Sequence, residues 1–215
     1  MDYLVELRRE LDAFGAVLDG DLSAPIEHCG GWRLMDLAVH MGAGNLWVVA
    51  AVRDGHGDGY DEGAAPRDRA GLKAWYAKTA EALVQALSVD AATEAWTFSP
   101  PHTVGSWRRR RSQETLMHRW DAEHALGSTK PMDALLATDG VAEVFDTMAP
   151  RMISKGGRHL SRAGRTDHRH RLWPLLDLRD RGADRGGLGN RRRPAADVVG
   201  PQASGYWIGD LGWGP

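Results

Sequence analysis

The sequence predicts an all-α protein: a four-helix bundle of up-down-up-down character, followed by a short, poorly formed C-terminal segment. Three observations favour this fold class. Apolar residues recur at helical spacing through the first two thirds of the 215-residue chain. Glycine, proline and aspartate interrupt that pattern between the helical stretches. After residue 155 the helical spacing ends and the composition changes to arginine, glycine and aspartate.

The first two helices differ in how much of their surface is apolar. The first is expected over residues 3–18 and ends at Asp19-Gly20-Asp21, with one apolar stripe formed by Leu4, Leu7, Leu11, Phe14 and Leu18. The second lies within CGGWRLMDLAVHMGAGNLWVVAAVRDG and begins after two glycines. Because this segment is apolar on most sides, we expect a largely buried helix.

Three further helices are expected after a Gly- and Asp-rich loop over residues 55–66. The helix over about residues 68–87 has one apolar face, made of Leu72, Trp75, Tyr76, Ala80, Leu83 and Leu87. Paired prolines in EAWTFSPPHTVGSW forbid a continuous helix there. A fourth helix is predicted over about residues 107–126, ending at Gly127, and a fifth over about 131–152.

The C-terminal segment has a composition unlike the rest of the chain. Residues 156–215 contain no glutamate and no lysine, and no helical or strand period lasts more than a few residues. One interpretation is a basic disordered tail that binds nucleic acid. The other is a frameshift near residues 155–170, since GC-rich DNA read out of frame encodes Arg, Gly, Ala and Pro. The predicted division is therefore a bundle over 1–155 and a degenerate or frameshifted segment over 156–215.

The overall composition excludes several classes of protein. The net charge of −2 gives no general support for nucleic-acid binding. No apolar run is expected to reach the length of a membrane span, and the amphipathic N-terminus is unlike a signal peptide. Cys29 is the only cysteine, which excludes an internal disulfide and a Cys-based zinc site; an inert buried thiol is favoured over a nucleophile. We expect a cytoplasmic protein with no nucleic-acid or membrane partner.

A carboxylate and an imidazole share one face of the predicted fourth helix. Glu114 and His118 lie four residues apart, so their side chains are one turn apart. Both are normal ligands of zinc and similar divalent metals. The spacing alone favours an ordinary Glu–His pair on the helix surface over a metal site.

His40 adds a third candidate ligand from the second helix. It lies in the apolar run LMDLAVHMGAGNLWVV, where a polar group needs a partner. The simpler interpretation is a core histidine with one hydrogen bond. However, Gly42, Ala43 and Gly44 allow another helix to approach closely. If that helix carries Glu114 and His118, two histidines and a carboxylate leave one coordination position open, as in catalytic sites.

Other polar residues have less specific interpretations. The run Arg108–Arg111 is read mainly as a solvated face that pairs with acids, with Arg108 and Arg111 as candidates for binding an anionic substrate or a thiol cofactor's carboxylate. Asp121 and Asp36 are candidates for orienting His118 and His40. No role is assigned to the remaining histidines of the bundle region, which are His28, His56, His102 and His124.

Three segments, GWRLMDLAVHMG, RRSQETLMHRWDAEHALG and LLATDGVAEVFD, resemble the mycothiol-dependent maleylpyruvate isomerase family of actinobacteria. The resemblance covers about residues 1–155 and implies a DinB-like metal-binding four-helix bundle. It also implies that His40, Glu114 and His118 bind the metal, typically zinc. Family members carry a small C-terminal α+β domain, of which residues 156–215 are at most a remnant. Only AADVVGPQASGYWIGDLGWGP echoes the family's ending, so no catalytic arginine is assigned.

The resemblance leads to two functional hypotheses. The first is a metal-dependent isomerase or S-transferase that uses a small thiol, by resemblance mycothiol, on an electrophile such as maleylpyruvate. In this mechanism the cation favours the thiolate, which adds to the substrate and leaves after bond rotation. The second is a non-catalytic metal-binding bundle of stress or detoxification type. The Arg-rich tail leads to a third hypothesis, a protein that binds nucleic acid. The nine tryptophans leave a homodimer open.

Overall fold

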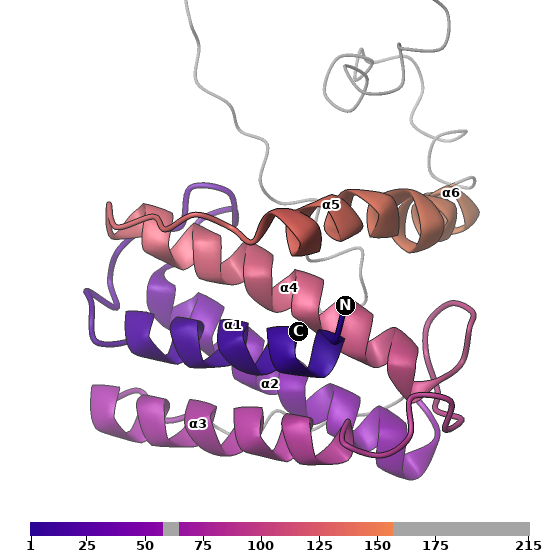
Figure 1. The fold of residues 1–215 in the computed structure, drawn as a ribbon. Coiled ribbons are helices and arrows are strands. Elements are labelled where there is room, and N and C mark those ends of the chain that lie inside the picture. Colours follow the sequence, from indigo (N-terminus) through magenta and orange to yellow (C-terminus); the bar gives the residue numbers. More distant parts are fainter. Residues whose placement is uncertain (58–64, 157–215) are drawn as a thin grey trace, which may run out of the picture. The chain divides into compact units, whose positions relative to one another are not determined.

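The structure, a computed structural model, describes residues 1–57 and 65–156. These residues form helices α1 (Tyr3–Val17), α2 (Leu34–Asp54), α3 (Arg69–Ala86), α4 (Val104–Ala125), α5 (Ala134–Glu143), the π-helix η1 (Val144–Met148) and α6 (Ala149–Gly156) (Figure 1). Within these ranges the only extended pairing is two isolated bridges, Pro25 with Arg33 and Glu94 with Thr103. The predicted all-α class is confirmed.

Short polar side chains fix where four of the helices begin. The side chains of Asp2, Asp68, Thr103 and Asp133 each accept at least one hydrogen bond from a backbone N–H in the first turn of α1, α3, α4 and α5. Such caps satisfy N–H groups that have no partner within the helix. The predicted fourth helix therefore starts three residues earlier than expected, because Thr103 caps it ahead of Trp107.

The four long helices form a bundle in which α1 packs against α3 and α4, and α2 packs against the same two helices (Figure 1). The core between them is apolar. The helical stripe predicted in α1 is buried at Leu7, Leu11 and Phe14, and Leu72, Tyr76 and Leu83 of α3 face the same core. The apolar faces predicted from the spacing are thus the faces that pack together.

The third and fourth helices run in directions opposite to those expected. Gly42 lies against Trp75, and Asn45 donates a hydrogen bond to Thr79 at 3.3 Å, so α2 and α3 are parallel. Helix α4 is antiparallel to α2 and parallel to α1 (Figure 1). The bundle is therefore up-down-down-up rather than up-down-up-down. The four-helix prediction holds, while the order of directions differs.

Helix α2 is the buried helix predicted from its apolar sequence. Leu34, Leu37, Ala38 and Met41 are fully buried. By length and composition alone, α2 is also able to span a membrane, whereas no segment was expected to be long and apolar enough. Its burial between α3 and α4 is the pattern of a core helix in a bundle.

The predicted fifth helix is divided into three pieces. Helix α5 is followed by the π-helical turn η1, and α6 continues from it. Pro150 follows this turn and has no N–H to continue the α-helical hydrogen-bond pattern, which accounts for an irregular turn at this place. The predicted domain boundary at residue 155 and both interpretations of the C-terminal segment concern residues 157–215, which lie outside the described ranges.

Candidate metal centre

The three predicted ligands come together between α2 and α4. Glu114 Oε1 lies 3.2 Å from His118 Nε2 and 3.5 Å from His40 Nε2. One donor atom from each residue lies within 4.8 Å of the other two. The two imidazole rings meet edge to face, with centroids 5.3 Å apart. Two helices therefore bring two imidazole nitrogens and one carboxylate oxygen to one place.

Gly42 makes room near His40 for α3, whereas α4 was the helix expected to approach there. A Cβ atom on Gly42 would overlap the ring of Trp75, which belongs to α3. Gly42 thus accommodates α3, and it does not explain the approach of α4. The antiparallel packing of α2 and α4 brings His40 level with Glu114 and His118.

A carboxylate fixes the orientation of His118. Asp121 Oδ2 lies 3.1 Å from His118 Nδ1, so the Nε2 atom of this ring is the one directed at Glu114. Asp121 therefore lies where a carboxylate can fix the tautomer of a metal-bound imidazole. The buried Cys29 thiol lies beside it, with Sγ 3.9 Å from Asp121 Oδ2. Asp36 accepts a hydrogen bond at 2.9 Å from the backbone N–H of Arg33 and so caps α2.

The candidate ligands are shielded from water. Their side chains are 8% exposed at His40, 13% at Glu114 and 11% at His118. The ring of Trp32 lies over His40, with the ring centroids 5.0 Å apart. Trp32 comes from the connection between α1 and α2, and its contact with His40 was not predicted. Charge–charge interactions are stronger in such a partly dehydrated place than on the surface.

Arg110 holds the outer oxygen of Glu114, a role that was not predicted from the sequence. Its Nη2 donates a hydrogen bond to Glu114 Oε2 at 2.6 Å, and its Nη1 pairs with Glu143 of α5. The i, i+4 spacing of Arg110 and Glu114 was the available signal. This arrangement leaves Oε1 of Glu114 for the two histidines.

The charges of the cluster follow from these contacts. Burial raises the pKa of Glu114, but the positive charge of Arg110 and the hydrogen bonds from the two histidines outweigh burial and hold this pKa well below its usual value. Burial lowers the pKa of His118, yet the hydrogen bonds to Asp121, Cys29 and Glu114 raise it well above its usual value. Burial lowers the pKa of His40. These contacts therefore favour an ionised Glu114 carboxylate that accepts hydrogen bonds from both imidazoles.

The arginine run is less exposed than the preferred interpretation expected, while Arg109 and Arg110 do pair with acids as that interpretation predicted. Arg108 donates to the backbone carbonyls of Leu87 and Val89 at the end of α3. Arg111 is almost completely buried, donates to Asn45 Oδ1 at 2.6 Å, and has a pKa lowered to about 10 by burial. The two cofactor-binding candidates thus have structural partners in the bundle. Asn45 and its link to Arg111 had no signal in the sequence.

Similarity to known proteins assigns the chain to a family. The family model for the mycothiol maleylpyruvate isomerase N-terminal domain matches residues 4–123, which is more than half of the chain. The chain therefore belongs to this family, and the resemblance seen in its motifs is confirmed. The matched range contains all three candidate ligands, and the helical bundle is consistent with the predicted DinB-like fold. No curated protein and no solved structure matches the chain.

Proposed function

We propose that this family member is a metal-dependent enzyme that uses a small thiol of the mycothiol type as cosubstrate. It would act as an isomerase or S-transferase on a small electrophile such as maleylpyruvate, in the cytoplasm and without nucleic-acid or membrane partners. One observation carries the proposal: His40, Glu114 and His118 present donor atoms within 4.8 Å of one another in a largely buried place. The family membership supplies the thiol and the substrate class.

The residues present fit a divalent metal, with zinc as the proposed ion. Two imidazole nitrogens and one carboxylate oxygen are the ligand set of catalytic zinc sites that keep a position open. Glu114 is ionised, as a ligand must be, and His118 has its other ring nitrogen held by Asp121. A divalent ion would have to displace the proton that the raised pKa of His118 favours, so binding at this site should release a proton and weaken as the pH falls.

The ion would supply a Lewis acid that favours the thiolate form of the thiol. The chain's own residues do the rest of the positioning. Asp121 holds the proton on Nδ1 of His118, and Arg110 fixes the Glu114 carboxylate from its outer side. Trp32 limits the access of water to His40.

A cavity beside Arg110 could take a small acidic molecule, and none of the three candidate metal ligands lines it. Its volume is about 240 Å³, which suits a small keto acid better than a whole thiol cofactor. Arg109 and Arg110 lie in its wall, and guanidinium groups bind carboxylates well. Both arginines are also paired with acids in this structure, so a substrate carboxylate would compete with Asp139 and Glu143.

The second candidate function is a metal-binding bundle without catalytic activity. It is favoured by the extent of the family match, which covers the N-terminal domain and ends at residue 123. The same three ligands would bind the ion in either case. The two functions differ in whether a thiol binds at the centre.

Activity assays with defined additions of zinc and mycothiol distinguish the enzyme from the non-catalytic metal-binding bundle. Zinc-loaded protein is expected to isomerise maleylpyruvate only when mycothiol is present, and Glu114→Gln should lower the rate at least 100-fold while its circular dichroism spectrum stays that of the bundle. His56→Ala, an exposed histidine away from the centre, should retain full activity. If zinc binds but the protein neither binds mycothiol nor turns over the substrate, the enzyme proposal is wrong and the metal-binding bundle replaces it.

A further inference from the structure

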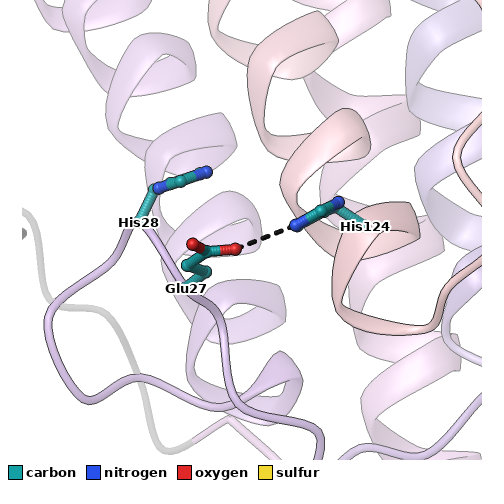
Figure 2. Close-up of side chains that lie close together, drawn as sticks. All are labelled: Glu27, His28 and His124. Atoms are coloured by element: carbon teal, nitrogen blue, oxygen red, sulfur yellow. Dashed lines mark hydrogen bonds and ion pairs between the residues drawn. The ribbon is translucent and has the colours of Figure 1, made fainter. Parts of the chain in front are cut away.

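We propose that Glu27, His28 and His124 form a second divalent-metal site, exposed at the surface and separate from the buried centre (Figure 2). All three residues are exposed, and one donor atom from each lies within 4.8 Å of the other two. Glu27 and His28 belong to the connection between α1 and α2, while His124 lies in the last turn of α4. The site would therefore join two parts of the chain that are far apart in the sequence.

The Glu27 carboxylate already points at His124 across this junction (Figure 2). Its Oε2 lies 2.9 Å from His124 Nε2. The ring of His28 lies almost parallel to that of His124, with centroids 6.1 Å apart. To bind a cation together with Glu27 and His124, the exposed His28 ring would have to turn out of this parallel arrangement, because an imidazole nitrogen binds a metal in the plane of its ring.

Trp120 holds the two imidazoles in related positions. Its ring stacks on His124 at 4.9 Å with an angle of 5° between the planes, and on His28 at 5.9 Å with an angle of 13°. The stacking keeps both imidazoles beside the last turns of α4, and part of it would be lost when His28 turns toward an ion.

The donor set indicates which ions the site would take. Two imidazole nitrogens and a carboxylate suit Zn²⁺, Ni²⁺ or Cu²⁺ rather than Mg²⁺ or Ca²⁺. Because the residues are exposed, water would complete the coordination and the ion would exchange readily. The site is distinct from the buried centre, since His124 lies six residues beyond His118, or about 9 Å along the helix axis.

An ion at this place would also act on the buried centre through the connection between α1 and α2. That connection carries Cys29, which lies beside Asp121, and Trp32, which covers His40. Tying Glu27 and His28 to α4 would hold these two residues in contact with the buried ligands and their support. The surface ion would thus stabilise the environment of the centre without belonging to it.

Zinc titration of matched variants tests the proposal. Equilibrium dialysis against Zn²⁺ with elemental analysis should show one fewer bound ion per chain in His124→Ala and in Glu27→Gln than in the unaltered protein. His56→Ala, another exposed histidine, should bind as many ions as the unaltered protein. His118→Ala should lose a different ion, so that the double variant His118→Ala/His124→Ala binds two fewer. Circular dichroism checks that each variant remains a helical bundle.

Paramagnetic quenching gives a second readout. Cu²⁺ at the surface site should quench the fluorescence of Trp120, and the quenched part should disappear in both Trp120→Phe and His124→Ala. Unchanged zinc stoichiometry in His124→Ala and Glu27→Gln would overturn the proposal. Failure of the buried centre has a different signature: His118→Ala would then bind as many ions as the unaltered protein, while His124→Ala would still bind one fewer.

Discussion

At the scale of single residues, the candidate centre depends on groups that do not themselves touch the ion. Asp121 orients His118 through Nδ1, and Arg110 holds Glu114 through Oε2. Such supporting contacts fix ring orientation and ligand charge, and their loss weakens metal binding even when every ligand is present.

Asp121→Asn should therefore weaken zinc binding by about 10- to 100-fold. The amide keeps the shape of the carboxylate but removes the negative charge beside His118. The affinity can be measured by competition with a chromophoric chelator. Asp133→Asn is the matched control, because Asp133 caps α5 and asparagine caps equally well. Equal affinities in Asp121→Asn and the unaltered protein would show that Asp121 does not support the metal.

The site residues that could be predicted are those that lie within a few helical turns of one another in the sequence. The helical spacing of Glu114, His118 and Asp121 is enough to place them on one face of a helix. The contact of Trp32 with His40 was not predictable, because it depends on how the connection between α1 and α2 folds back. Arg110 had the right spacing to Glu114, but a run of four arginines gave no reason to choose it over its neighbours.

At the scale of the helices, the approach of α2 and α3 depends on one missing side chain. Gly42→Ala would bring a Cβ into overlap with the rigid ring of Trp75, so α2 or Trp75 must move. We expect a loss of about 1–3 kcal/mol in the free energy of unfolding, measured in urea, from overpacking.

The control for this variant is Gly15→Ala in α1. There the new Cβ would lie 3.5 Å from Tyr76, which is an ordinary contact. Alanine should stabilise that helix by up to about 1 kcal/mol. If both variants are equally stable, the close approach at Gly42 is not a packing constraint.

The attachment of α5 to α4 should depend on Asp139. Burial raises the pKa of this carboxyl, but hydrogen bonds from Arg109 and Tyr3 outweigh burial and lower it. Asp139→Asn should cost about 1 kcal/mol of unfolding free energy near pH 7. Because the folded pKa is depressed, this stabilisation is present above the unfolded pKa and is lost as the pH falls through the folded pKa.

Urea unfolding at pH 7 and at successively lower pH checks this sign. The difference between the unaltered protein and Asp139→Asn should shrink toward zero on acidification. Asp146→Asn changes a second, more exposed partner of Arg109 and should have a much smaller effect. A difference that grows on acidification would contradict the assignment.

Helix positions were predictable from periodicity, whereas helix directions were not. Residues 55–68 connect α2 to α3, and fully extended they span about 45 Å, more than the roughly 31 Å length of α2. A connection of this length allows the next helix to run either way. The division of the fifth helix likewise depends on one backbone N–H, missing at Pro150, inside an otherwise helical pattern.

At the scale of the whole molecule, charged groups inside the bundle join its first and fourth helices. Glu10, Arg119 and Glu123 are at most 4% exposed, and Arg119 pairs with both carboxylates. Removing Arg119 takes away the cation that the buried carboxylates of Glu10 and Glu123 share. Arg119→Ala should therefore lower the unfolding free energy by about 3–5 kcal/mol.

The exposed pair Arg8–Glu81 provides the comparison, because it joins α1 to α3 across the surface. Glu81→Ala should cost at most about 1 kcal/mol. Chemical denaturation of the two variants in the same buffer measures both values. Similar losses for the two variants would mean that burial of the Glu10–Arg119 pair does not determine its contribution.

The central claim is that His40, Glu114 and His118 bind one divalent ion, and metal content measures it most directly. After saturation with Zn²⁺ and removal of weakly bound ions, elemental analysis should find one tightly held zinc per chain in the unaltered protein. Glu114→Gln and His118→Ala, each still folded by circular dichroism, should hold none. Tightly bound zinc that persists undiminished in both variants would contradict the account.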